Sequence, residues 1–351
     1  MTVTVPPTWM RWRVDGGGTG SDVVAKGREL VDGPEKGGSL VVTQPVGGGG
    51  RMQLWDLKRD APVGEEEDLI VPLGSDVVAK YSRYDSENQS GEPQLERQLT
   101  GERISLRIPG LPRSFNVLPG GWDPPAFAWW SDGIVAFDPS TGKPLGPVMT
   151  VPGVQLDVLS ASETPDSALA VVTWSVDAPH SETGVFDIST GQLLVRGLYD
   201  LDSSHALDRD QLIGVAPDYA RRYDIHTLKP ISALARAIGG SQLTSVSTDG
   251  RTLLNVGFNN ALTLYDLTAD IALATPLDSD APGARLRGGY LTADGETLLE
   301  ALPDGIRVWD LRLAEQASQA CALAGRELTE EEWSTYFPGE ERVDTCAALT
   351  S

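Results

Sequence analysis

The sequence predicts an all-β fold in which a unit of about four short strands is repeated seven times. Three observations support this prediction. A short apolar segment that ends in an aromatic residue followed by Asp recurs roughly every forty residues. Hairpin turns that contain Gly recur at matching places between these segments. Gly and Pro, at 38 and 24 of 351 residues, are frequent, as expected where tight turns join many strands.

The aromatic-Asp pairs mark the end of one strand in each unit. Their Asp residues lie 82, 49, 37, 42 and 44 residues apart, so the first gap spans two units. A degenerate copy is therefore expected near Glu96, within a segment that also carries a Thr-Gly turn. We expect each ring to pack between units and each carboxylate to hold a turn. The six pairs are Trp55-Asp56, Phe137-Asp138, Phe186-Asp187, Tyr223-Asp224, Tyr265-Asp266 and Trp309-Asp310.

The turns around these pairs assign the other strands. Pro139–Pro144 and Ile188–Leu193 place Gly where a tight hairpin needs positive φ, so each is predicted to join a third strand to a fourth. Asp-Gly turns after Ser247 and Leu291 are predicted to join a first strand to a second. One complete unit is predicted as the strands Leu243–Ser247, Thr252–Phe258, Ala261–Leu267 and Ile271–Leu277.

The first unit is the least regular. Gly20–Lys26 and Gly74–Lys80 have identical sequences, and we assign both to the second strand of adjacent units. Residues 31–50, however, include four consecutive Gly residues and the apolar run Ser39–Thr43. Either an insertion separates the second and third strands here, or the strand assignment shifts.

A unit of this length, built entirely of strands, is typical of a β-propeller blade and too rich in turns for a helical solenoid. The pattern stops after Asp310, and Arg312–Arg326 is rich in Ala, Leu, Gln and Glu and indicates a helix. The seventh unit therefore lacks its outer strand. Thr2–Val5 is expected to pair there and close the ring.

The chain is thus predicted to divide into a seven-bladed propeller, residues 1–311, and a helical tail packed on it, residues 312–351. In the tail, Thr329 and Glu332 have the spacing of a capping box that begins a short helix.

The aromatic-Asp pairs resemble the Trp-Asp end of the third strand in a WD-repeat blade. The tail, which ends in Thr345-Cys346, resembles the segment after the propeller in actinobacterial WD-repeat proteins, especially those fused to STAND-type signalling NTPases. This resemblance covers nearly the whole chain and implies the scaffold or sensor half of a larger signalling protein. The chain departs from the eukaryotic pattern because it lacks Gly-His dipeptides, and it carries no Gly-x-x-x-x-Gly-Lys-Ser/Thr phosphate loop.

Composition excludes several partners. The net charge of −22, from 50 acidic and 28 basic residues, disfavours nucleic-acid binding. No apolar run is long enough to span a membrane, and Met1–Pro7 lacks the features of a secretory signal. We therefore expect a cytoplasmic monomer.

The Cys and His residues suggest no metal site. Cys321 and Cys346 are expected either to form a disulfide in the tail or to be buried thiols. His180, His205 and His226 are expected in surface loops or turns, without neighbours at metal-ligand spacing.

Other polar patterns also fall short of a catalytic or cofactor site. The acidic cluster lacks the residue order of a calcium loop and is expected to be a solvated loop. No Gly-x-Ser-x-Gly nucleophile motif occurs, so no catalytic residue or cofactor is assigned. The cluster consists of Asp200, Asp202, Asp208 and Asp210.

The aromatic residues Trp122, Trp129 and Trp130 are candidate binding residues, because Trp at the rim of a propeller can anchor a partner. The alternative is that they, like Trp174, belong to the core. The predicted function is a non-enzymatic platform that binds a protein or peptide. Two alternatives stay open: a lactonase-like or quinoprotein-like propeller enzyme with a metal at the channel mouth, and a small-ligand sensor.

Overall fold

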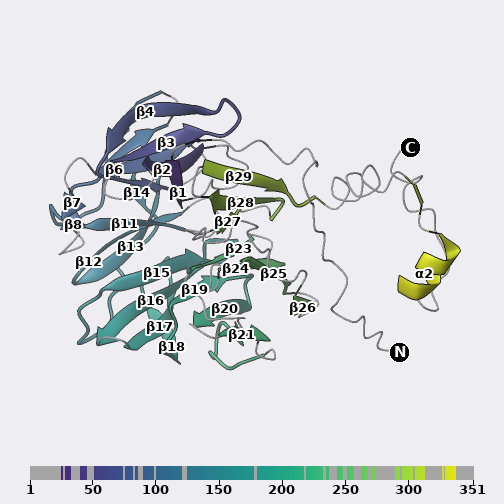
Figure 1. Cartoon of the computed structure of the whole chain (residues 1–351). Coiled ribbons are helices and arrows are strands. Elements are labelled where there is room, and N and C mark those ends of the chain that lie inside the picture. Colours follow the sequence, from purple (N-terminus) through teal and green to yellow (C-terminus); the bar gives the residue numbers. More distant parts are fainter. Residues whose placement is uncertain are drawn as a thin grey trace.

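A computed structural model describes most of the chain, and the residues that it describes form seven small antiparallel sheets, a two-stranded hairpin and one short helix (Figure 1). The predicted all-β class is therefore confirmed. The described residues are 25–26, 28–32, 40–45, 51–73, 76–81, 84–85, 90–98, 100–120, 125–177, 180–216, 219–231, 235–236, 243–247, 251–256, 262–267, 271–272, 289–292, 295–302, 305–312, 326–327 and 329–336.

Each sheet is formed by strands that follow one another in the chain. The first contains β1 (Arg28–Asp32), β2 (Leu40–Pro45), β3 (Met52–Asp56) and β4 (Ala61–Glu67). The second contains β5 (Leu69–Pro72), β6 (Val77–Tyr81), β9 (Gln94–Arg97) and β10 (Arg103–Ile104), with a small hairpin of β7 (Tyr84–Asp85) and β8 (Ser90–Gly91). The third contains β11 (Asn116–Pro119), β12 (Ala126–Trp130), β13 (Gly133–Asp138) and β14 (Lys143–Pro144).

The remaining sheets repeat this order. The fourth contains β15 (Val158–Glu163), β16 (Leu169–Asp177), β17 (His180–Asp187) and β18 (Leu193–Tyr199). The fifth contains β19 (Ser203–Ala206), β20 (Gln211–Ala216), β21 (Tyr219–Asp224) and β22 (Ala235–Arg236). The sixth contains β23 (Leu243–Val246), β24 (Thr252–Val256), β25 (Leu262–Asp266) and β26 (Ile271–Ala272). The seventh contains β27 (Gly289–Leu291), β28 (Thr297–Leu302) and β29 (Gly305–Asp310).

The aromatic-Asp pairs end the third strand of six sheets, namely β3, β13, β17, β21, β25 and β29. In the second sheet the third strand is β9, which contains Glu96, where the sequence predicts the degenerate copy. The period in the sequence therefore corresponds to one sheet per unit.

The Asp at the end of a third strand accepts hydrogen bonds from the turn that follows it. The carboxylate of Asp138 accepts bonds from Ser140 N at 2.8 Å and from Thr141 Oγ1 at 2.7 Å. Asp187 Oδ1 accepts a bond from Thr190 N at 2.9 Å. Burial raises the pKa of Asp138, but the hydrogen bonds from Ser140 and Thr141 outweigh it and the pKa is lowered. These turns thus hold the outer strand against the third.

Seven clusters of buried apolar residues lie at the seven boundaries between neighbouring sheets. The aromatic ring of each third-strand pair belongs to the cluster toward the preceding sheet. Phe186 of the fourth sheet, for example, packs with residues of the third. Trp55 of the first sheet packs with Val308 of the seventh.

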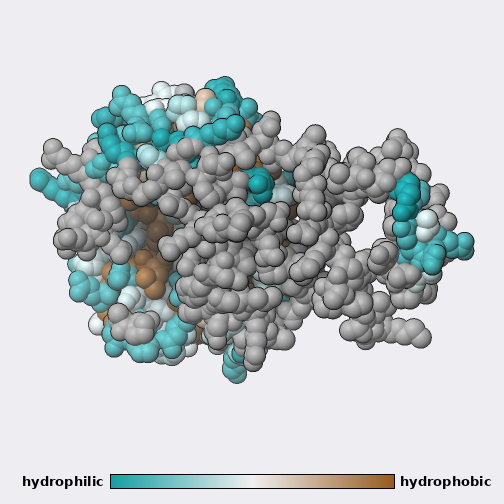
Figure 2. Space-filling model, in the orientation of Figure 1, coloured by the Kyte–Doolittle hydropathy of each residue, from teal (hydrophilic) through white to brown (hydrophobic). Residues whose placement is uncertain are grey.

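The last sheet of the chain packs on the first. Val41 of β2 is fully buried in one cluster with Leu299 of β28 and Ile306 of β29. Figure 1 shows the sheets following one another around the molecule until the seventh lies beside the first. Figure 2 shows mainly hydrophilic outward surfaces on the described residues, with hydrophobic atoms between the upper and lower sheets.

The assignment for the first unit is wrong. Ala25 and Lys26 lie in a bend before β1, and the second strand is β2, Leu40–Pro45. The matching segment of the second sheet is correctly assigned, because Val77–Tyr81 is the second strand β6. The apolar run in residues 40–43 thus supplies the strand that the repeated segment was expected to form.

The helix α2 (Glu330–Tyr336) begins at the predicted capping box, in which Glu332 N donates to Thr329 Oγ1 at 3.2 Å and Thr329 N donates to Glu332 Oε2 at 2.8 Å. Figure 1 shows α2 to one side of the sheets. Thr2–Val5, Cys321 and Cys346 lie outside the described residues, so ring closure by the N-terminal strand, the disulfide and the division at residue 311 stay predictions.

None of the described helical residues forms a helix long and apolar enough to cross a bilayer.

Candidate partner-binding surface

Exposed apolar side chains are concentrated on the fourth sheet. Among the described residues, six large apolar side chains are exposed, and four of them belong to this sheet. The other two lie outside strands: Leu145 directly follows β14 of the third sheet, and Ile231 lies between β21 and β22 of the fifth. The four are Leu159 at 45%, Val176 at 53%, Leu194 at 48% and Tyr199 at 61% exposure.

Leu159, Val176 and Tyr199 lie at one end of the sheet, where β16 leads to β17 and β18 leads toward β19. Trp174, Glu182 and Tyr199 are register partners on three adjacent strands, so their side chains lie side by side on one face. Val176 lies two residues beyond Trp174, and Leu159 is the second residue of β15. With nine and eight residues, β16 and β17 are the longest described strands, so this end extends the sheet.

The same end is strongly acidic. Of the nine Asp and Glu residues in 144–208, five lie at this end, while Glu163, Asp166, Asp187 and Asp208 lie toward the opposite end, and Arg196 is the single Lys or Arg of this range. Arg196 Nε lies 3.6 Å from Glu182 Oε1, and the Glu182 side chain is only 8% exposed. The other carboxylates here, those of Asp157, Asp177, Asp200 and Asp202, belong to exposed residues.

His180 forms an ion pair at this end. Its Nδ1 lies 2.8 Å from Asp200 Oδ1, and both side chains are exposed. The hydrogen bond that the His180 ring donates to Asp200, together with the negative charges of Asp200 and Asp177, raises the pKa of His180. Loss of hydration around the carboxyl raises the pKa of Asp202. The acidic surroundings thus favour the protonated form of the His180 imidazole.

A short segment ties this end of the fourth sheet to the third. Leu156 N donates to Ser131 O at 2.8 Å, and Ser175 N donates to Asp157 O at 2.8 Å. The turn between β12 and β13 is therefore held next to the end of β16. Half-buried Trp130 precedes this turn, and exposed Asp132 lies within it.

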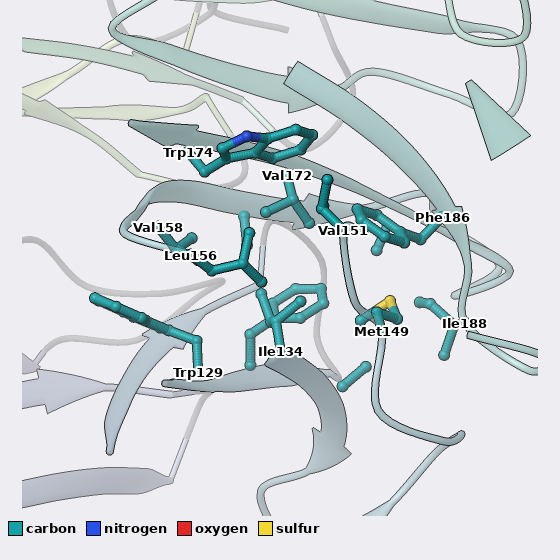
Figure 3. Packing of buried hydrophobic residues seen from close by; sticks show 14 residues of the cluster. Trp129, Ile134, Met149, Val151, Leu156, Val158, Val172, Trp174, Phe186 and Ile188 are labelled. Atoms are coloured by element: carbon teal, nitrogen blue, oxygen red, sulfur yellow. The ribbon is translucent and has the colours of Figure 1, made fainter. Parts of the chain in front are cut away.

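Trp129 and Trp174 lie beneath this surface. Figure 3 shows the two rings on either side of Leu156 and Val158, in the cluster between the third and fourth sheets. Trp129 is only 8% exposed, so it is a core residue and not an exposed binding residue as considered from sequence. Within the described part of the chain, the buried Nε1 atoms of Trp129 and Trp174 have no hydrogen-bond partner. Trp122 lies outside the described residues.

Buried hydroxyl groups fix the fourth sheet against the fifth. Thr173 Oγ1 is hydrogen-bonded to Thr183 Oγ1 at 2.8 Å and to Ser204 Oγ at 2.6 Å. Ser181 Oγ donates to Leu201 O at 2.6 Å. Such satisfied polar networks specify one arrangement of the elements they join. Sequence reasoning missed this network, whose only signal is the presence of Ser and Thr residues in β16, β17 and β19.

Two of the three histidines are placed differently from expectation, whereas His226 lies in a turn and the four Asp residues of the acidic cluster are exposed and outside strands, as expected. His180 is the first residue of β17 and His205 lies within β19, so neither lies in a loop. Burial lowers the pKa of His205 to about 4. The acidic residues divide into two pairs at opposite ends of β19, with Asp202 before the strand and Asp208 after it. Among the described residues, no group of three or more His, Cys, Asp or Glu side chains is placed to hold a metal.

A hollow of about 270 Å³ lies elsewhere, between the outer strand of the first sheet and the second sheet. Its charged groups largely satisfy one another. Lys80 Nζ lies 2.7 Å from Glu96 Oε1, and Glu67 Oε2 lies 3.4 Å from Arg51. It holds no aromatic residue and is lined by Gly64, Glu65, Glu67, Lys80, Gln94, Glu96 and Arg103. We therefore place the candidate surface at the end of the fourth sheet.

No protein-family model and no curated protein matches this chain in sequence. The assignment of a function thus rests on the residues and their arrangement.

Proposed function

We propose that this chain is a seven-bladed β-propeller of the WD-repeat type that acts as a non-enzymatic platform for a protein or peptide partner. The observation that carries the fold is the set of seven apolar clusters, one at each boundary between sheets, including the boundary between the seventh sheet and the first. A ring of sheets leaves no large exposed edge and is rigid, so it presents its loops and strand ends at fixed positions.

The concentration of exposed apolar residues on one sheet supports the role as a platform. Exposed apolar side chains scattered singly need no explanation, but a group of them on one element marks an interaction site. Val176 and Tyr199 are both more than half exposed at one end of the fourth sheet. The neighbouring sheets hold this end through main-chain and hydroxyl hydrogen bonds. A partner would therefore meet a preformed surface.

We further propose that the platform belongs to a bacterial signalling system in the cytoplasm, on the basis of the resemblance of the repeats and the tail to WD-repeat signalling proteins. The length of β16 and β17 and the local charge both fit this role. Carboxylates occur next to the exposed apolar side chains and keep the chain soluble while no partner is bound.

The experiment is an affinity capture with the purified chain as bait in lysate of its own organism, with and without a chelator, and with the metal content of the bait measured in parallel. We expect a specific protein on the bait that the chelator does not release. Stoichiometric metal on the bait together with no retained protein would instead favour the propeller enzyme and would contradict the platform.

A further inference from the structure

We infer that the end of the fourth sheet binds a basic segment of a partner that also carries apolar side chains. We call this end the acidic end; it is defined by Asp157, Val176, Asp177, Tyr199 and Asp200. This inference rests on the proposed function and specifies the chemistry of the partner.

Two apolar side chains at the acidic end are exposed to solvent. Tyr199 is 61% and Val176 is 53% exposed, although both lie within strands of a well-packed sheet. Tyr199 lies on the same face as Trp174, which is fully buried against the third sheet. The apolar core of this boundary thus continues outward into exposed side chains. When a partner covers such side chains, each Å² of apolar area removed from water contributes about 25 cal/mol to the free energy of binding.

The charges at the acidic end indicate a positively charged partner segment. Four exposed carboxylates, those of Asp157, Asp177, Asp200 and Asp202, lie at this end, and Arg196 is the single Lys or Arg in residues 144–208. That one cation, Arg196, lies beside the buried carboxylate of Glu182 and does not offset the exposed groups. Exposed Asp177 directly follows Val176, and exposed Asp200, which is paired with His180, directly follows Tyr199. An acidic partner would be repelled here, and an uncharged one would leave the charges of Asp157 and Asp177 uncompensated.

A second copy of this chain does not fit the same surface. The chain carries a net charge of −22, so two copies repel each other before contact. The occupant is therefore a different protein, with Lys or Arg side chains opposite the carboxylates and apolar side chains over Val176 and Tyr199.

The test measures binding of a labelled synthetic peptide that alternates Lys and Leu to the full chain. Two further peptides replace every Lys by Glu or every Leu by Gly. We expect only the Lys-Leu peptide to bind well, and its affinity to fall as salt is raised, because salt screens exposed charges. No binding of this peptide, or equal binding of the Glu-Leu peptide, would overturn the inference.

Variants locate the site. The double variant Asp157→Lys with Asp177→Lys is expected to weaken binding by about tenfold or more, since it reverses two surface charges. The matched control, Glu65→Lys with Glu92→Lys, makes the same charge change at exposed residues of the first sheet and the connection within the second, and should change affinity about twofold or less. Tyr199→Ser should weaken binding, while Ile231→Ser, which removes an equally exposed apolar side chain from another sheet, should not.

The outcomes separate this inference from the platform itself. If the bait retains a protein partner that neither the double variant nor Tyr199→Ser releases, the platform stands and the acidic end is not its binding site. If both sets of variants weaken peptide binding equally, binding reflects the charge of the whole chain and the inference is wrong.

Discussion

The ring of Trp174 stands edge-on to the ring of Phe186, with centroids 6.4 Å apart and an interplanar angle of 62°. Both rings are fully buried. They come from the second and third strands of the fourth sheet and pack toward the third sheet (Figure 3). Edge-to-face pairs of this kind are more favourable than face-to-face stacking. The pair therefore supports the frame on which the acidic end is built.

Replacing Trp174 by Ala should lower the free energy of unfolding by about 3 to 5 kcal/mol, because a large buried ring is lost and a cavity remains. Trp174→Phe should cost much less, since it keeps most of the contact and removes a buried Nε1 that has no hydrogen-bond partner in the described structure. Denaturant unfolding measures both changes. Equal losses for the two variants would show that the indole nitrogen has a partner in solution.

Gly184 is expected to resist substitution because Trp174 occupies the space next to it. A Cβ atom at Gly184 would lie 2.8 Å from Cη2 of Trp174 and 3.0 Å from Cδ1 of Leu193. Gly184→Ala should therefore destabilise the chain by about 1 to 3 kcal/mol. The loss should shrink in a double variant that also carries Trp174→Leu. Purely additive losses would argue against this contact.

Much of this arrangement follows from the sequence, for physical reasons. An aromatic residue that must pack between sheets and an Asp that must hold a turn recur once per sheet, so their spacing predicted the third strands, including β9 with Glu96. The first sheet was misassigned because two copies of one sequence, 20–26 and 74–80, differ in structure where both are described, at Ala25-Lys26 and Ala79-Lys80. Ala25 bends the chain before β1, whereas Ala79 lies within β6.

The candidate surface was less accessible to sequence reasoning. Trp129 and Trp130 are adjacent on β12 and point to opposite faces of the sheet. Trp129 therefore belongs to the core, whereas Trp130 is half-buried. The sequence alone does not show that Val176 and Tyr199, near the ends of β16 and β18, are exposed. The low number of basic residues in 144–208 was visible in the sequence and is the signal that could have identified this region.

The packing of the seventh sheet on the first can be tested with Leu299. This residue is fully buried in the cluster that joins the two sheets. Leu299→Ala should cost about 2 to 5 kcal/mol and should shift a single unfolding transition of the whole chain. Leu254→Ala, in the cluster between the sixth and seventh sheets, is the matched control and should behave alike. An early transition confined to the seventh sheet in Leu299→Ala alone would mean that the ring is open there.

His205 should titrate well below an ordinary histidine, since burial in β19 lowers its pKa from 6.5 to about 4. The unfolded chain then binds a proton on this side chain before the folded chain does. Stability is therefore retained above pH 6.5 and is lost as pH falls from there toward 4. Because the His205 side chain is only half-buried, we expect the free energy of unfolding to fall by less than about 3 kcal/mol over this pH range. NMR titration of its ring protons gives the pKa directly, and an ordinary value would contradict the burial.

Hydrogen exchange of the chain, measured with and without the protein that the bait retains, shows whether the partner binds at the acidic end. Binding at the acidic end predicts slower exchange at residues 155–160, 174–182 and 196–203, with unchanged exchange in β4 and β25. A retained protein that slows exchange only in other sheets would contradict the assignment of the surface. A bait that retains no protein at all would contradict the platform.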